Sequence, residues 1–167
     1  KADKLLNEGD ELFRAQNFHS ALQKYKLAAS TAPDVAEAFW RQGHALVATH
    51  NYDLATTAFK RAIALTEDLG RDGFQLNDLY AGAQMTKSNH LESLAEWATK
   101  CSTSADPYFL VGLFLNYDGQ ASRAEKFFKR ASDLAGISGG HIAVFLDAAE
   151  EAPRISGKLS RPAGALP

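Results

Sequence analysis

The sequence predicts an all-α protein assembled from repeated pairs of helices, and both its periodicity and its composition support this prediction. Gly9 and Gly43 stand 34 residues apart, and each is followed by alanine twelve residues later and by an aromatic residue sixteen residues later. The same arrangement begins again at Gly112. A fixed period of this length is typical of helical repeats. The chain of 167 residues is 46% hydrophobic and 23% charged, which is the composition of a globular protein.

The first repeat is expected near residues 2–35, as two antiparallel helices. The small residues Gly9 and Ala21 allow the helices to approach closely, and the ring of Tyr25 fills the space beside them. Asn17 is a favourable N-cap for the second helix.

The second repeat, near 36–69, follows the same plan, with Asn51 at the expected N-cap. The fourth repeat, near 105–138, begins at Asp106-Pro107 and turns at Asp118-Gly119.

The third repeat, near 75–104, is degenerate. Gly82 takes the glycine position, but the small-to-aromatic pair is replaced by Leu94 and Ala98. Asn89 is expected to cap the second helix of this repeat, with Glu92 at capping-box spacing. Extra residues near Leu69 to Phe74 precede this repeat.

A capping helix over 140–151 is expected to close the stack, so that residues 1–152 form one domain. The remaining segment, 153–167, contains three prolines, three basic residues and no acidic residue. We expect it to be an extended or disordered basic tail, and a plain linker is the simplest interpretation of it.

The repeats resemble those of the tetratricopeptide repeat family, whose signature is a large apolar residue, glycine, a second large apolar residue, Ala-x3-aromatic, alanine and often proline. The residues that carry the resemblance are Leu5, Gly9, Leu12, Ala21, Tyr25, Ala28 and Pro33; Phe39, Gly43, Leu46, Ala55, Phe59 and Ala62; and Tyr108, Gly112, Leu115, Ala124, Phe128 and Ala131. With the degenerate copy they cover residues 2 to 138. The resemblance implies a right-handed α-solenoid of stacked helix-turn-helix repeats.

The resemblance also implies a concave groove, lined by the first helix of each repeat, that binds a peptide or a segment of a partner protein. The residues expected to line it are Asn7, Phe13, Arg14, Trp40, Arg41, His44, Tyr80, Lys87, Phe109, Asn116 and Tyr117. Trp, Tyr and Arg are the residue types that most often anchor interfaces. The expected hot spots are Trp40, Arg41, Tyr80, Phe109 and Tyr117. The alternative is that Trp40 and Phe109 pack between repeats, or that the capping helix or the tail covers the groove.

Family members that hold chaperone C-termini use a clamp of Lys, Asn and Arg residues around the terminal carboxylate. The corresponding positions here hold Leu6, Asp10, Arg41, Leu76 and Tyr80. Asp10 would repel a carboxylate, so we expect chaperone tails not to bind. An aromatic groove favours a hydrophobic or proline-containing peptide instead.

Several other functions are not expected. The net charge of −2 lacks the broad positive field of most nucleic-acid binders, so nucleic acid is not an expected partner. The five histidines show no metal-ligand spacing, and the glycines match no phosphate-binding or dinucleotide motif. We therefore expect no metal site, no cofactor and no catalytic residues. No apolar run is long enough for a membrane-spanning helix, so membrane insertion is not expected either.

The first hypothesis for function is a non-enzymatic protein-protein interaction scaffold. The second is a self-assembly or autoregulatory module, in which the basic tail fills its own groove or that of a neighbour. The charge of +3 on residues 153–167, against −5 on residues 1–152, favours such a contact. A third is the docking part of a longer enzyme or envelope protein. The start at Lys1 suggests an excised domain, from either the cytoplasm or a bacterial cell envelope.

Overall fold

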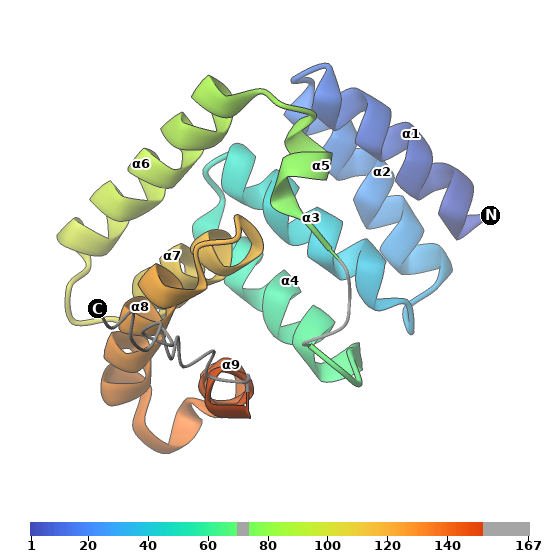
Figure 1. The fold of residues 1–167 in the computed structure, drawn as a ribbon. Helices are drawn as coiled ribbons and strands as arrows, with labels where there is room; N and C mark the ends of the chain where they lie inside the picture. Colours follow the sequence, from blue (N-terminus) through green and yellow to red (C-terminus); the bar gives the residue numbers. More distant parts are fainter. Residues whose placement is uncertain (70–73, 152–167) are drawn as a thin grey trace, which may run out of the picture.

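The computed structural model describes residues 1–69 and 74–151, and the regular structure of these residues is helical (Figure 1). The elements are α1 (Ala2–Arg14), α2 (Phe18–Thr31), α3 (Ala36–Ala48), α4 (Tyr52–Leu65), α5 (Leu76–Tyr80), α6 (Gln84–Lys100), α7 (Ala105–Tyr117), α8 (Ala121–Ala135), a single 3-10 turn (Gly136–Ser138) and α9 (Gly140–Glu151). Within the same residues, none of the helices combines the length and apolar character needed to cross a bilayer.

Three antiparallel helix pairs, α1/α2, α3/α4 and α7/α8, carry the 34-residue repeat. In each pair the repeat glycine lies against the aromatic ring of the second helix. A Cβ atom at Gly43 would lie 2.5 Å from the ring of Phe59, and one at Gly112 would lie 2.8 Å from that of Phe128. Gly9 faces Tyr25 in the same way. The predicted all-α architecture of stacked helix pairs is confirmed.

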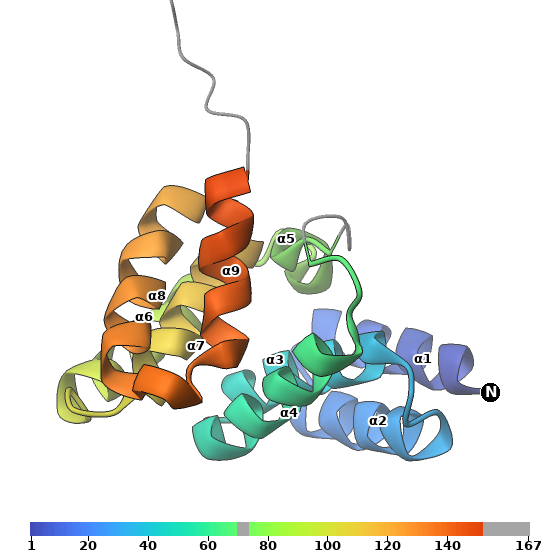
Figure 2. The same ribbon diagram turned by 90° about the horizontal axis from the view of Figure 1, so that it is seen from below.

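The pairs stack on one another, but the order is interrupted in the middle of the chain. Helix α2 packs on α3, as in a regular solenoid, whereas α4 packs against α7 and α9. Helix α5 lies against α1, and α6 runs along the edge of the molecule against α7 (Figures 1 and 2). Helix α9 packs beside α8 at the C-terminal end of the described chain.

The third repeat differs from its prediction. Its first helix, α5, has only five residues and ends at Ala81 and Gly82, whose φ values of 48° and 80° are left-handed. A Cβ atom at Gly82 would meet nothing within 4 Å, unlike those at the other repeat glycines. Asn89 lies inside the 17-residue helix α6, so the prediction that it caps a helix is wrong.

The other predicted helix ends are confirmed in part. The side chain of Asn17 accepts a hydrogen bond from the backbone N–H of Ser20. Asn51 precedes α4, but its side-chain amide donates to the carbonyl of Thr49 instead of capping the helix. Helix α7 begins after Ser104, with Asp106 and Pro107 in its first turn. The predicted basic tail, 153–167, lies outside the described residues.

Candidate partner-binding groove

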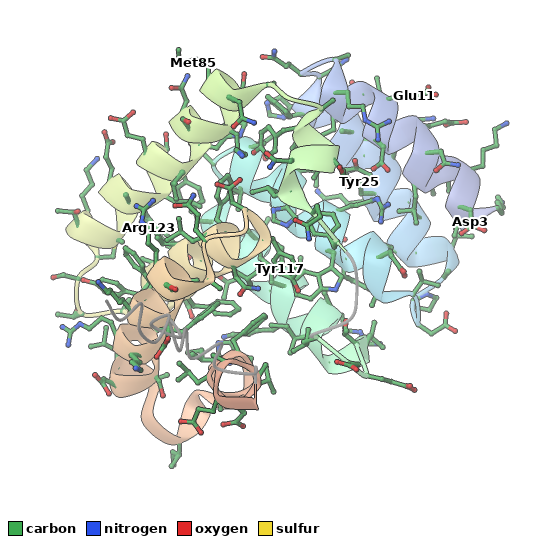
Figure 3. All side chains as sticks on the ribbon, viewed as in Figure 1. Asp3, Glu11, Tyr25, Met85, Tyr117 and Arg123 are labelled. Atoms are coloured by element: carbon green, nitrogen blue, oxygen red, sulfur yellow. The ribbon has the colours of Figure 1, made fainter. Side chains whose placement is uncertain are left out.

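Most of the residues predicted to line the groove are buried between helices. Asn7 and Arg14 are exposed, and Arg41 and Asn116 are half-buried. The other seven are buried: Phe13, Trp40, His44, Tyr80, Lys87, Phe109 and Tyr117. Figure 3 shows Tyr117 in the middle of the view, whereas Met85 lies at the outer edge. The expected hot spots other than Arg41 are therefore largely shielded from solvent.

Trp40 and Tyr117 belong to an aromatic cluster that joins α3 to α7. Their ring centroids are 5.1 Å apart, and the indole N–H of Trp40 donates to the hydroxyl of Thr66 at 3.2 Å. Phe74 extends the cluster, with its ring edge-on to Tyr117 at 5.4 Å and stacked on His44 at 5.2 Å. Phe74 comes from the segment before α5, whereas the other three rings come from α3 and α7.

His44 is enclosed by this cluster and has only 1% of its surface exposed. Neither ring nitrogen has a hydrogen-bond partner among the described residues. Burial, with a smaller contribution from the charge of Arg41, lowers the pKa of His44 to about 3. The imidazole is therefore neutral at pH 7 and has no contact through which to act as an acid or base.

Tyr80 and Lys87 hold α5 and α6 in place. The hydroxyl of Tyr80 lies 2.5 Å from Nδ1 of His90 on α6, and its ring packs edge-on to Phe13 of α1. The ammonium of Lys87 pairs with the carboxylate of Asp118, after α7, and donates to Oδ1 of Asn77 on α5. Lys87 is thus a buried structural cation.

Phe109 points toward α9. Its ring is edge-on to that of His141 at 4.7 Å, and its side chain is fully buried. The alternative, in which Trp40 and Phe109 pack between repeats, fits the contact of Trp40 with Tyr117, whereas Phe109 packs against the capping helix α9.

Arg41 is fixed by a carboxylate at the junction of the first two repeats. Its Nε donates to both oxygens of Asp10, at 2.9 and 3.2 Å, and the hydroxyl of Tyr25 donates to the same carboxylate at 2.7 Å. Burial and the charge of Asp10 raise the pKa of Tyr25 well above its usual range. These contacts tie α1, α2 and α3 together and commit the charge of Arg41 to Asp10.

Phe74 forms part of the wall of three adjoining cavities. We call them together the Phe74 groove. The first, of about 270 Å³, lies between α1, α3 and α5; the second, of about 400 Å³, lies between the start of α3 and the end of α4; the third, of about 280 Å³, lies between α7, α8 and α9. The first and second also share Glu37 and Arg41, and the first and third share Gln75.

The Phe74 groove includes only part of the predicted site. Five predicted residues lie on its walls: Arg14, Trp40, Arg41, Asn116 and Tyr117. The other six are absent from the walls of these cavities: Asn7, Phe13, His44, Tyr80, Lys87 and Phe109.

Many wall residues of the Phe74 groove were not predicted from the sequence, among them Glu37, Phe74, Gln75 and Asp78. The extra residues before the third repeat were the one feature of the sequence that could have indicated these wall residues, because an insertion between repeats can pack on the stack. The walls also carry the exposed carboxylate of Asp34, so acidic side chains gather around the first two cavities. This charge favours a partner segment that carries basic side chains.

Residues 1–69 and 74–151 contain no group of three or more His, Cys, Asp or Glu side chains arranged to hold a metal ion.

No family model and no curated protein matches the chain. Solved structures with similar folds include a MamA protein, with 16% sequence identity over 89% of this chain and 82% of that chain and a TM-score of 0.38. MamA from Desulfovibrio magneticus RS-1 has 21% identity over 89% of each chain and a TM-score of 0.38. TTC0263, a thermophilic TPR protein in Thermus thermophilus, has 18% identity over 93% of each chain and a TM-score of 0.36. Because these TM-scores are low, the assignment of stacked repeats rests on the helix pairs and their glycine contacts.

Proposed function

We propose that this chain is a non-enzymatic scaffold that holds an extended segment of a partner protein in the Phe74 groove. The observation that carries the proposal is that three cavities, which together reach from α1 to α9, share Phe74 as a wall residue. Rigid stacked helices present the walls of such a groove at fixed spacing, so that the scaffold loses little conformational freedom on binding.

Within the groove, the residues proposed to contact the partner are those with accessible polar groups. Arg14 and Asn116 remain from the sequence-based set, and Glu37, Gln75 and Asp78 are added to it. Trp40 and Tyr117 contribute the edges of buried rings. The proposed partner segment is therefore extended and carries basic side chains beside apolar ones or prolines.

The alternative is that the groove takes the basic tail, 153–167, of the same chain or of a neighbour. Two observations support it: the tail carries three basic residues and no acidic residue, and Ala148 and Ala149, in the last turns of α9, form part of the wall of the third cavity. In this case the scaffold would regulate its own accessibility or assemble with itself.

Peptide binding tests the groove and separates the two candidates. Extended peptides of about twelve residues, which span at most ~40 Å, would be titrated into the chain in a Trp97→Phe background, so that fluorescence reports on Trp40 in the second cavity. We expect saturable binding of peptides with Lys or Arg, weakened about tenfold in the Glu37→Lys/Asp78→Lys variant, because two attractive contacts become repulsive.

The matched control is Glu92→Lys/Asp133→Lys, which changes the net charge by the same amount at exposed positions outside the groove walls. The synthetic peptide 153–167 forms a separate arm. If it binds the groove and competes with the other peptides, the tail is the occupant; if it does not bind, a foreign segment is favoured. Equal weakening in both double variants would contradict the groove assignment.

A further inference from the structure

A second groove lies on the opposite side of α3 from the Phe74 groove. Its volume is about 500 Å³, and no wall residue is shared between the two. We call it the Leu54 groove, and its main wall residues are Lys26, Phe39, Gln42, Leu46, Leu54 and Arg61. At 3.6 residues per turn, Phe39, Gln42 and Leu46 lie on the face of α3 opposite to Glu37 and Arg41. A partner here would leave the Phe74 groove open.

Two helix faces form the apolar walls. Helix α3 contributes residues at i, i+3 and i+7 from Phe39, of which Phe39 and Leu46 are apolar. Helix α4 contributes residues at i, i+3, i+4 and i+7 from Leu54, of which Leu54 and Ala58 are apolar. Each stretch of seven residues is ~10 Å long, so the groove runs for two helical turns. Leu54 is 55% exposed, which leaves a large apolar side chain in contact with water at the edge of an apolar depression. Such surfaces mark interaction sites.

The charged wall residues of the Leu54 groove are both basic. Lys26 on α2 and Arg61 on α4 are exposed, and the walls contain no carboxylate. The guanidinium of Arg61 donates to the carbonyl of Pro33 at 3.2 Å and lies 5.8 Å from the ring centroid of Phe39, which holds it at the groove edge. Because the chain as a whole carries −2, this edge is a local exception that favours an acidic partner.

We propose that the Leu54 groove docks a short amphipathic helix of another protein, whose apolar side chains at i, i+3, i+4 and i+7 fill the groove and whose flanking carboxylates pair with Lys26 and Arg61. A helix fits because the apolar walls repeat with the helical spacing of α3 and α4. The chain's own segment 153–167 has the wrong charge for this site, because its ionisable side chains are all basic. The proposal concerns a surface separate from the Phe74 groove and does not depend on it.

The test uses two designed helical peptides and the full chain. Both peptides have leucines at i, i+3, i+4 and i+7 on an alanine background; one has pairs of glutamates at its ends and the other has pairs of lysines. Calorimetry gives the affinities, and amide chemical-shift changes in NMR spectra give the site. We expect the glutamate peptide to bind at least about tenfold more tightly than the lysine peptide, with shifts concentrated at Gln42, Ala58 and Arg61.

Leu54→Asp should weaken binding of the glutamate peptide by about tenfold or more, since it places a carboxylate in the apolar groove. Leu27→Asp is the matched control, because Leu27 is 53% exposed and lies on α2 outside the groove walls. Arg61→Glu is a second variant, which reverses a charge at the edge of the groove and leaves the apolar side chains in place. Glu37→Lys/Asp78→Lys should bind the peptide as the unchanged chain does, which separates this proposal from the Phe74 groove.

Several results would overturn the proposal: no binding of the glutamate peptide, equal affinity for both peptides, shifts confined to other helices, or equal loss in Leu27→Asp. Sedimentation of the full chain tests the remaining candidate occupant, which is a second copy of the chain. If Leu54→Asp converts a dimer to a monomer, the groove is filled by a second copy of the chain and the proposed partner is wrong.

Discussion

Gly43 is a position where the absence of a side chain allows two helices to pack closely. A Cβ atom there would lie 2.5 Å from the ring of Phe59, which is buried and cannot swing away. We expect Gly43→Ala to lower the free energy of unfolding by up to about 2 kcal/mol, because a clash that costs about 1–3 kcal/mol outweighs the ~1 kcal/mol that alanine gains in helix propensity. Denaturant unfolding measures this change.

Gly140→Ala is the control for helix propensity, since a Cβ atom at Gly140 meets nothing within 4 Å. It should leave the free energy of unfolding unchanged or slightly raised. If Gly43→Ala were as stable as Gly140→Ala, the close contact between glycine and ring would not constrain the pair.

His44 makes the stability of the fold depend on pH. Its pKa is about 3 in the folded chain and about 6.5 when unfolded, so the unfolded state binds the proton first as the pH falls. The stabilising contribution is complete above pH ~6.5 and is lost progressively down to pH ~3. At pH 4 the stability lost amounts to about 3 kcal/mol.

His44→Phe should therefore flatten the loss of stability between about pH 6.5 and pH 4, as measured by denaturant unfolding at each pH. Part of the slope should remain, because burial and the charge of His50 also lower the pKa of His90, to about 4. His19→Phe, at an exposed position, is the control. An unchanged slope in His44→Phe would show that the proton binds equally well to both states.

Helix α6 depends on the buried cation that joins it to its neighbours. Lys87 pairs with Asp118 beyond α7 and with Asn77 of α5, and both members of the ion pair are largely shielded from solvent. Lys87→Met should destabilise the chain by about 3–5 kcal/mol, because it leaves the shielded carboxylate of Asp118 with the amide donor of Gln120 but without its counter-charge. Hydrogen exchange should rise most in α5, α6 and the end of α7.

Lys100→Met, at an exposed position of the same helix, should change the stability by less than ~0.5 kcal/mol. The double variant Lys87→Met/Asp118→Asn should recover part of the loss, because it removes both charges. No recovery would mean that packing of the lysine stem, rather than its charge, anchors α6.

Across the whole molecule, the sequence was most informative where the repeat was regular. Gly9, Gly43 and Gly112 were predicted to face rings, and each one does. The groove was harder to predict, because facing the concave side and being accessible there are different properties. Tyr80 and Phe109 lie on first helices of the predicted repeats, yet α6 and α9 cover them. Neither covering contact is encoded by the 34-residue period.

The sequence by itself determined the helix pairs and their internal packing, because those depend on contacts between residues close along the chain. Asn17 acts within the first repeat and Gly43 within the second, and the role of each follows from the spacing of residues in its own repeat. Only the tertiary structure decided that α4 meets α7, that Lys87 is buried against Asp118, and that Phe74 enters the groove. Those contacts join segments separated by an irregular repeat, where periodicity no longer fixes which surfaces meet, and their burial depends on the whole packed molecule.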